Sequence, residues 1–164
     1  MFLDTANHVL RLLNISTGKV STVAGNKTQG KDYQGGLEGS EQTLASPWDI
    51  CLGYSPGSVN TEYGPDVLYI AMAGTHQIWG YILEESIYWK NVKRKAGRCY
   101  AIAGSGVEEN RNTSYPLKAG FAQPSGITYD MDAHAIYVAD SESSSIRKLS
   151  IKDGSVSKVI GGGR

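Results

Sequence analysis

Apolar and polar positions follow one pattern that occurs three times along the chain. The copies read FLDTANHVLRLL at 2–13, LYIAMAGTHQIWGY at 68–81 and IYVADSESSSIRKL at 136–149. Each copy has an apolar run rich in β-branched and aromatic residues, then a polar turn, then a second apolar run that alternates. This pattern predicts two antiparallel strands joined by a tight connection.

The copies recur at a fixed spacing. Asp4, Met72 and Asp140 align in one column, because 72 minus 4 and 140 minus 72 are both 68. A further strand that ends on glycine follows each pair, and a strand with a proline at its start precedes the second and third pairs: 19–25, 99–104, 155–161, 46–53 and 123–130. Glycine allows the positive φ with which the chain leaves the sheet. Four short antiparallel strands per repeat are typical of a β-propeller blade.

Three motifs carry a family resemblance. They are T-A-N-H-V-L-R at 5–11, P-x-G-I at 124–127 and Y-V-A-D at 137–140. They resemble the NHL repeat, whose family forms six-bladed propellers. The match extends through SPWD at 46–49 and the EENRN loop that begins at residue 108, and there it is similar to NHL proteins in which a thioredoxin-like domain precedes the propeller.

The resemblance implies an all-β fold, an incomplete NHL-type β-propeller with just under three four-stranded antiparallel blades of an expected six. Residues 1–25 would supply the last three strands of one blade, 46–104 a full blade and 123–161 another. Segments 26–45 and 105–122 would be inter-blade loops, and 54–66 and 83–98 insertions within the second blade. An open arc leaves two apolar blade faces in water, so we expect the isolated chain to self-associate through them.

Composition narrows the choice of partner and compartment. Sixteen basic and sixteen acidic residues balance, so no global field attracts nucleic acid or an anionic membrane. Cys51 and Cys99 are expected on the first and last strands of one blade, about 14 Å apart at ~4.8 Å per strand, beyond the ~7 Å limit for a disulfide. Free thiols and the absence of a signal peptide pattern favour the cytosol.

The two long loops differ in composition. Loop 26–45 is rich in glycine and poor in apolar residues, and we expect a mobile connector. Loop 105–122 is dense in hydrogen-bonding groups, and its candidate partner-binding residues are Glu108, Glu109, Asn110, Arg111, Asn112 and Tyr115. Arg and Tyr are enriched at interface hot spots. The alternative is that Arg111 and the asparagines only pin the loop to the neighbouring blade.

Strand direction predicts which loops share a face. Loops 26–45 and 105–122 should lie on one face with the repeat turns, and the insertions 54–66 and 83–98 on the opposite face. Insertion 54–66 holds two prolines and three turn signals, which indicate an exposed hairpin extension. The basic run KNVKRKAGR at 90–98 is expected to be a solvated surface.

Several repeat columns hold residues that could carry chemistry, but each has a structural interpretation. The column members are Asp4, Asn7, His8, Arg11, His76, Trp79, Asp140 and Arg147. Asp4 and Asp140 should accept N–H groups of the turn that follows, in an Asx-turn, and Thr75 should close the middle turn where Met72 replaces the acid. His8 and His76 should brace their own turns, and the flat groups of Arg11, Trp79 and Arg147 should pack over a neighbouring surface.

These features predict a non-catalytic protein-interaction scaffold. We assign no catalytic residue, cofactor or metal, and we expect a protein partner rather than a membrane or a nucleic acid. Any redox activity would belong to the thioredoxin-like domain that the resemblance implies. One alternative is a propeller enzyme, a hydrolase or lyase with a channel metal. The other is an RNA-binding propeller, which would need a basic face and a strong salt dependence of affinity.

Overall fold

The structure is a computed structural model that describes residues 1–59 and 61–162. It is all-β with short 3-10 turns, and among the described residues no helix is long and apolar enough to cross a membrane. The strands are β1 (Phe2–Asp4), β2 (Val9–Leu13), β3 (Val20–Ala24), β4 (Gly35–Glu38), β5 (Pro47–Gly53), β6 (Val67–Met72), β7 (Gln77–Ile82), β8 (Ser86–Tyr88), β9 (Val92–Arg94), β10 (Arg98–Ala103), β11 (Pro124–Asp130), β12 (Ala135–Asp140), β13 (Ser145–Ser150) and β14 (Val156–Gly161).

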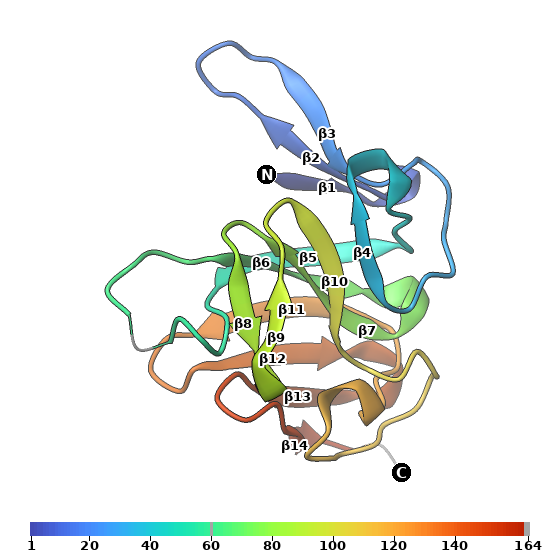
Figure 1. The fold of residues 1–164 in the computed structure, drawn as a ribbon. Helices are drawn as coiled ribbons and strands as arrows, with labels where there is room; N and C mark the ends of the chain where they lie inside the picture. Colours follow the sequence, from blue (N-terminus) through green and yellow to red (C-terminus); the bar gives the residue numbers. More distant parts are fainter. Residues whose placement is uncertain (60, 163–164) are drawn as a thin grey trace.

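Three antiparallel sheets stack in chain order, as Figure 1 shows from top to bottom. Blade one has the order β1-β2-β3, blade two β4-β10-β7-β6-β5, and blade three β11-β12-β13-β14. A separate hairpin, β8-β9, is inserted between β7 and β10. This confirms the predicted fold class, an incomplete propeller.

The middle blade is buried on both faces because successive side chains of a strand point to opposite sides of the sheet. All six residues of β6 are buried. Val67, Tyr69 and Ala71 belong to the hydrophobic core between blades two and three. Leu68, Ile70 and Met72 belong to the core between blades one and two. The continuous apolar run of β6 is thus the sequence signature of a blade with a neighbour on each side.

The repeat turns have the same backbone in all three blades. Turns η1 (Thr5–Asn7), η3 (Ala73–Thr75) and η6 (Ser141–Ser143) each end on a left-handed residue, with φ of 53° at His8, 54° at His76 and 50° at Ser144. The glycine that follows or ends each last strand has the predicted positive φ, 105° at Gly25, 106° at Gly104 and 105° at Gly161. A Cβ on any of these glycines would lie within 2.7 Å of the carbonyl oxygen of the left-handed residue in the repeat turn of its own blade, which is His8, His76 or Ser144. Only glycine therefore fits at these positions.

Side chains join each blade to the next. His8 Nδ1 accepts the backbone N–H of Ser46 at 2.9 Å, and Thr5 Oγ1 donates to the carbonyl of Pro47 at 2.7 Å. In the next interface His76 Nδ1 accepts the N–H of Gln123 at 3.1 Å. The prediction that the histidines brace their own turns is therefore wrong. The Nδ1 atom of each histidine accepts a hydrogen bond from the residue directly before the first strand of the following blade.

Segment 26–45 is ordered by packing, not mobile as composition suggested. Its strand β4 pairs with β10 and becomes the outer strand of blade two, followed by the turn η2 (Gly39–Glu41). Leu44, Ala45 and Gln42 are buried. Gly35 at φ 80° lies so close to the carbonyl of Cys99 that a Cβ would be 2.3 Å from it. The glycines are there for close approach to the sheet, which a count of apolar residues does not detect.

Candidate functional site: a cleft between blades two and three

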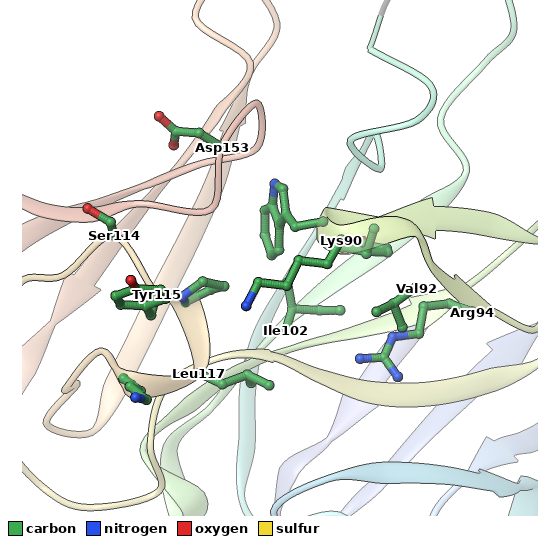
Figure 2. A pocket seen from close by; sticks show the side chains of 12 residues that line it. Lys90, Val92, Arg94, Ile102, Ser114, Tyr115, Leu117 and Asp153 are labelled. Carbon is green, nitrogen blue, oxygen red and sulfur yellow. The ribbon is translucent and has the colours of Figure 1, made fainter.

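A cavity of about 400 Å³ opens where three separate segments meet. They are the β8-β9 hairpin with its turn η4 (Trp89–Asn91), the second half of loop 105–122 with its turn η5 (Pro116–Lys118), and the turn between β13 and β14. Figure 2 shows Lys90 reaching from the hairpin towards Tyr115. The lining residues are Tyr88, Trp89, Lys90, Val92, Arg94, Ile102, Ser114, Tyr115, Pro116, Leu117, Lys118 and Asp153.

Backbone hydrogen bonds hold the loop side of the cleft in place. Thr113 exchanges N–H···O bonds of 3.0 and 2.8 Å with Val156, so the loop pairs with the outer strand β14. Pro116 starts η5, where its missing N–H costs nothing, and its carbonyl accepts the N–H of Gly104 at 2.9 Å. The aromatic and cationic groups at 114–118 are therefore presented on a fixed backbone.

The hairpin side is anchored on blade three. Trp89 Nε1 donates to the carbonyl of Ile151 at 2.9 Å, and its ring stacks edge-on against Tyr88 with centroids 5.4 Å apart. Gly154 lies beneath it at φ 79°, where a Cβ would be 3.0 Å from the Trp89 ring. At the hairpin tip Lys90 and Asn91 both have φ of 60°. Asn is enriched in that region but Lys is not, so the tip holds Lys90 in an unusual conformation beside the cleft.

The cleft is electropositive above an apolar floor. The ammonium groups of Lys90 and Lys118 lie 5.8 and 5.4 Å from the centroid of the Tyr115 ring. Arg94 stacks over Tyr100 at 4.5 Å, and its Nε is buried without a hydrogen-bond partner. Burial lowers the pKa of the Arg94 guanidinium, yet arginine stays charged in proteins. The single acid in the lining, Asp153, accepts the N–H and the hydroxyl of Ser155, and these bonds lower the pKa of its carboxyl.

This arrangement corrects the predicted division of loops between two faces. Insertion 83–98 and loop 105–122 line one cavity, because the insertion folds into a hairpin that leans on blade three and the loop runs along the edge of β14. The basic run 90–98 is also not simply solvated. Arg98 donates to the carbonyl of Gly36 at 2.7 Å and lies 3.6 Å from the Glu38 carboxylate. In the described part of insertion 54–66, Asp66 is buried and accepts the N–H and hydroxyl of Ser55.

The six candidate partner-binding residues do not form one surface. Tyr115 lines the cleft and is 57% exposed. Glu108 lies 4.0 Å from Nε2 of His76, and Glu109 pairs with Arg111 at 2.7 Å. Asn110 is exposed. Asn112 points back to blade three, so only Tyr115 among the six belongs to the cleft.

Asn112, rather than the side chain of Arg111, anchors the loop. The buried Arg147 donates from Nη2 to Asn112 Oδ1 at 2.9 Å and to the carbonyl of Arg111 at 3.0 Å. From Nη1 it donates to the carbonyl of Gly120 at 2.7 Å. Arg147 also lies over the ring of Phe121 at 5.3 Å. Arg147 therefore has the packing role predicted for its repeat column, and it also forms hydrogen bonds that hold the loop.

The acidic column closes its turns differently from the prediction. Asp140 Oδ1 accepts the N–H of Ala122, which precedes its blade, and Oδ2 accepts the Ser143 hydroxyl. Burial raises the pKa of the Asp140 carboxyl, against the opposing effect of these bonds and of Arg147. In the middle blade Met72 Sδ accepts the N–H of Ala45 at 3.3 Å, while the hydroxyl of Thr75 is buried without a partner. Thr75 therefore does not close that turn.

The columns of Asp140 and Arg147 hold other residues or make other contacts in blades one and two. Asp4 accepts both Asn7 Nδ2, at 2.9 Å, and Arg11, at 2.9 Å, on a partly exposed surface. These contacts lower the pKa of the Asp4 carboxyl, Asn7 most strongly. In blade two Trp79 takes the place of the arginine, and its Nε1 donates to Gln77 Oε1 at 2.9 Å. Gln77 in turn donates to the carbonyl of Tyr33 at 3.1 Å, so each long loop is tied to the blade that follows it.

A second cavity of about 290 Å³ lies beside the inter-blade histidine. It is lined by Gln29, Ser46, Trp48, Ala73, Gly74, His76 and Gln123. Trp48 is 57% exposed there. Within residues 1–59 and 61–162, no three His, Cys, Asp or Glu side chains converge in a way that could hold a metal ion.

Sequence reasoning missed Trp89, Lys90, Leu117 and Lys118. None of them falls in a repeat column, because they lie in an insertion and in a loop. A usable signal was Trp89 directly before the basic run, since Trp is enriched at interface cores.

Comparisons with known proteins agree with the repeat. Residues 121–149 match the family model of the NHL repeat. The chain is 48% identical to human NHL repeat-containing protein 2 over 163 residues, which is 98% of this chain and 22% of that protein. It is 44% identical to the Arabidopsis thaliana protein SUPPRESSOR OF QUENCHING 1, chloroplastic, over 98% of this chain and 13% of that protein. The predicted resemblance to NHL proteins is confirmed, and the chain spans about a fifth or less of these relatives.

Solved structures share the fold at low sequence identity. A protein of unknown function from Bacteroides thetaiotaomicron superposes with a TM-score of 0.56 at 21% identity, over 96% of this chain and 32% of that chain. An auxiliary nutrient binding protein from Bacteroides ovatus gives 0.55 at 19% identity, over 96% and 33%. This likeness concerns the fold alone.

Proposed function

We propose that this chain is a non-catalytic protein-interaction platform, in which stacked propeller blades hold a partner-binding cleft between blades two and three. The observation that carries the proposal is the cleft lined by Trp89, Tyr115 and Leu117 and rimmed by three cations. Its backbone is fixed by pairing with β14 and by the Trp89–Ile151 bond. Rigid elements that present aromatic anchors lose little conformational entropy when they bind.

The cleft has the composition of an interface hot spot. Tyr, Trp and Arg dominate such sites, and apolar pockets near them take side chains of the partner. Tyr115 and Leu117 are 57% and 49% exposed, so both are accessible to a partner. A partner would bury them. The free thiols of Cys51 and Cys99 support the cytosol, or another reducing compartment, as the place where this happens.

Site-specific photocrosslinking tests the proposal in the protein as it occurs in cells. A photoreactive amino acid replaces Leu117, inside the cleft, or Tyr63, which is 76% exposed and does not line the cleft. We expect a discrete crosslinked partner at position 117 and not at 63. The purified partner should then bind the Tyr115→Ala variant at least tenfold more weakly, a loss of about 1.4 kcal/mol, while Tyr63→Ala binds normally.

Tyr115→Ala is a safe probe of binding because the tyrosine supports little of the fold. Its backbone N–H bonds to Thr113 Oγ1 and its carbonyl accepts from Lys118, and alanine keeps both. Replacing the whole loop would instead remove the Thr113–Val156 pairing and the Asn112–Arg147 bond. Unchanged affinity of the partner for Tyr115→Ala would refute the proposed platform.

A further inference from the structure

The cations around the cleft are uncompensated, and this points to the chemistry of the occupant. Ion pairs elsewhere in the described chain join Arg11 to Asp4, Arg98 to Glu38 and Arg111 to Glu109. No described lysine has a carboxylate within 4.0 Å of its ammonium nitrogen, and Arg94 has none near its guanidinium. What distinguishes Lys90, Arg94 and Lys118 is that all three line one cavity. Three positive charges surround one cavity, and the only acid in its lining, Asp153, is held by Ser155.

Two of these charges are aimed at the same ring. Lys90 and Lys118 come from different segments, yet both ammonium groups lie within 5.8 Å of the Tyr115 ring centroid. The face of an aromatic ring attracts a cation weakly, whereas like charges gathered at one place repel. Anionic groups supplied by a ligand would relieve that repulsion. The rim of the cleft is therefore complementary to carboxylates spaced on either side of Tyr115.

The interior of the cleft is suited to an apolar group. Val92, Ile102, Pro116 and Leu117 form its aliphatic walls. The volume of about 400 Å³ falls in the range of about 300–1,000 Å³ that is usual for ligand pockets. On the basis of the proposed function, we infer that the cleft binds an acidic peptide segment. An aromatic or aliphatic side chain of the peptide occupies the cavity, and flanking Glu or Asp side chains pair with Lys90, Arg94 and Lys118.

Single-stranded RNA would also use cations and aromatic rings, but the geometry favours the peptide. Base stacking needs an open ring face, whereas Lys90 and Lys118 flank Tyr115 and Trp89 is packed against Tyr88 and bonded to Ile151. The walls between these groups are aliphatic, which suits a Leu or Phe side chain.

Fluorescence polarisation with labelled peptides tests the inference. Three synthetic dodecapeptides carry the same central Phe-Leu pair, flanked by Glu, by Lys or by Ser. A fourth carries Glu flanks around Ser-Ser, and a single-stranded oligouridine of matched charge is a fifth probe. We expect the Glu-flanked Phe-Leu peptide to bind at least tenfold more tightly than the other four. Lys90→Glu should weaken that binding about tenfold, and Asn91→Gly, which keeps the positive φ at the same hairpin tip, should not.

The outcomes separate this inference from the proposed function. Equal binding of the Glu-flanked and Lys-flanked peptides, tighter binding of the oligouridine, or no peptide binding up to millimolar concentration would overturn the acidic-peptide inference. The platform would still stand if the crosslinked partner lost affinity for Tyr115→Ala. Conversely, peptide binding that is insensitive to both Tyr115→Ala and Lys90→Glu would place the peptide elsewhere and contradict the inference directly.

Discussion

The imidazole Nδ1 of His76 accepts the backbone N–H of Gln123 at 3.1 Å, and so joins the repeat turn of blade two to the residue that precedes the first strand of blade three. His8 makes the equivalent bond with Ser46. Both acceptor histidines have φ near 54°, and the two donor residues, Ser46 and Gln123, also have positive φ, 48° and 54°. Each of these two blade interfaces therefore contains a hydrogen bond between two left-handed residues.

We predict that His76→Leu destabilises the protein by about 1–2 kcal/mol. It removes the acceptor of the exposed Gln123 N–H, a bond worth about 0.5–1.5 kcal/mol, and it places a residue that disfavours positive φ at this position. His76→Asn should recover part of the loss, because Asn tolerates the left-handed region although it cannot reach Gln123 in the same way. Denaturant unfolding of the three proteins measures this. Equal stability of His76→Leu and the original protein would mean that the bond does not hold the blades.

The two neighbouring loop residues Arg111 and Asn112 should differ in their effect on stability. Asn112→Ala removes the acceptor for the buried Arg147, and a net loss of about 1 kcal/mol is expected for one hydrogen bond. Arg111→Ala removes an exposed ion pair with Glu109, which is worth about 0–1 kcal/mol. Thermal unfolding should therefore show a lower midpoint for Asn112→Ala than for Arg111→Ala. The reverse order would show that the Arg111 side chain is the anchor.

Removing one member of the Asp140–Arg147 pair should lower the free energy of unfolding more than replacing both members. Both side chains are almost fully buried, and Arg147 Nη1 lies 3.2 Å from Asp140 Oδ2. Arg147→Trp alone, like Asp140→Met alone, leaves one buried charged group without its partner, which costs about 3–5 kcal/mol. The double variant Asp140→Met/Arg147→Trp copies the Met72 and Trp79 of blade two and should be closer in stability to the original protein. Additive losses in the two single variants and the double variant would contradict this coupling.

Alkaline pH should weaken the fold. Burial raises the pKa of the Cys51 and Cys99 thiols from 9.0 to about 12, and it raises that of Tyr129 to about 12. These pKa values are higher in the folded state than in the unfolded state. The stability that the protonated groups contribute is therefore fully present below pH 9 and is lost as the pH rises towards 12. Denaturant midpoints between pH 8 and 11 measure the decline. A midpoint that rises over this range would contradict the burial of the three groups.

The same burial predicts low thiol reactivity in the native protein. The thiolate is the reactive form, and at pH 8 a group of pKa about 12 is almost entirely protonated. A thiol reagent should label neither cysteine in the native state and both, without reductant, after denaturation, because the structure has two free thiols. Absence of label after denaturation would show a disulfide.

The repeat made the turns and strand ends predictable, because residues 68 apart share a local conformation. His8, His76 and Ser144 are examples, with φ of 53°, 54° and 50°. The links between elements were not predictable in this way. Ser46 is 38 residues from His8, and the donor to Met72 Sδ comes from Ala45 in a loop that looked featureless. Column alignment describes what each repeat does within itself, whereas these bonds depend on how successive repeats stack.

The cleft was hidden from the sequence for a related reason. Its walls come from an insertion, a loop, a turn and the β10 residue Ile102, and the inserted hairpin has no counterpart in the other repeats. Strand direction predicts the side from which each segment leaves its blade. It does not give where the segment goes next, and here the β8-β9 hairpin leans on Ile151 while the 105–122 loop follows β14. Only Tyr115 of the predicted binding residues belongs to the cleft, because it alone lies on the part of the loop that faces the hairpin.

Hydrogen exchange of the protein with and without its crosslinked partner tests the central claim, that the cleft is the binding surface, most directly. Mass spectrometry of backbone amides reads every segment at once, so it does not presuppose the site. We predict that the partner slows exchange in 86–94 and 113–118, the hairpin and loop walls, and leaves 26–34 and 54–59 unchanged. Protection confined to the smaller cavity around Trp48 and His76, with none in the hairpin or in η5, would contradict the account.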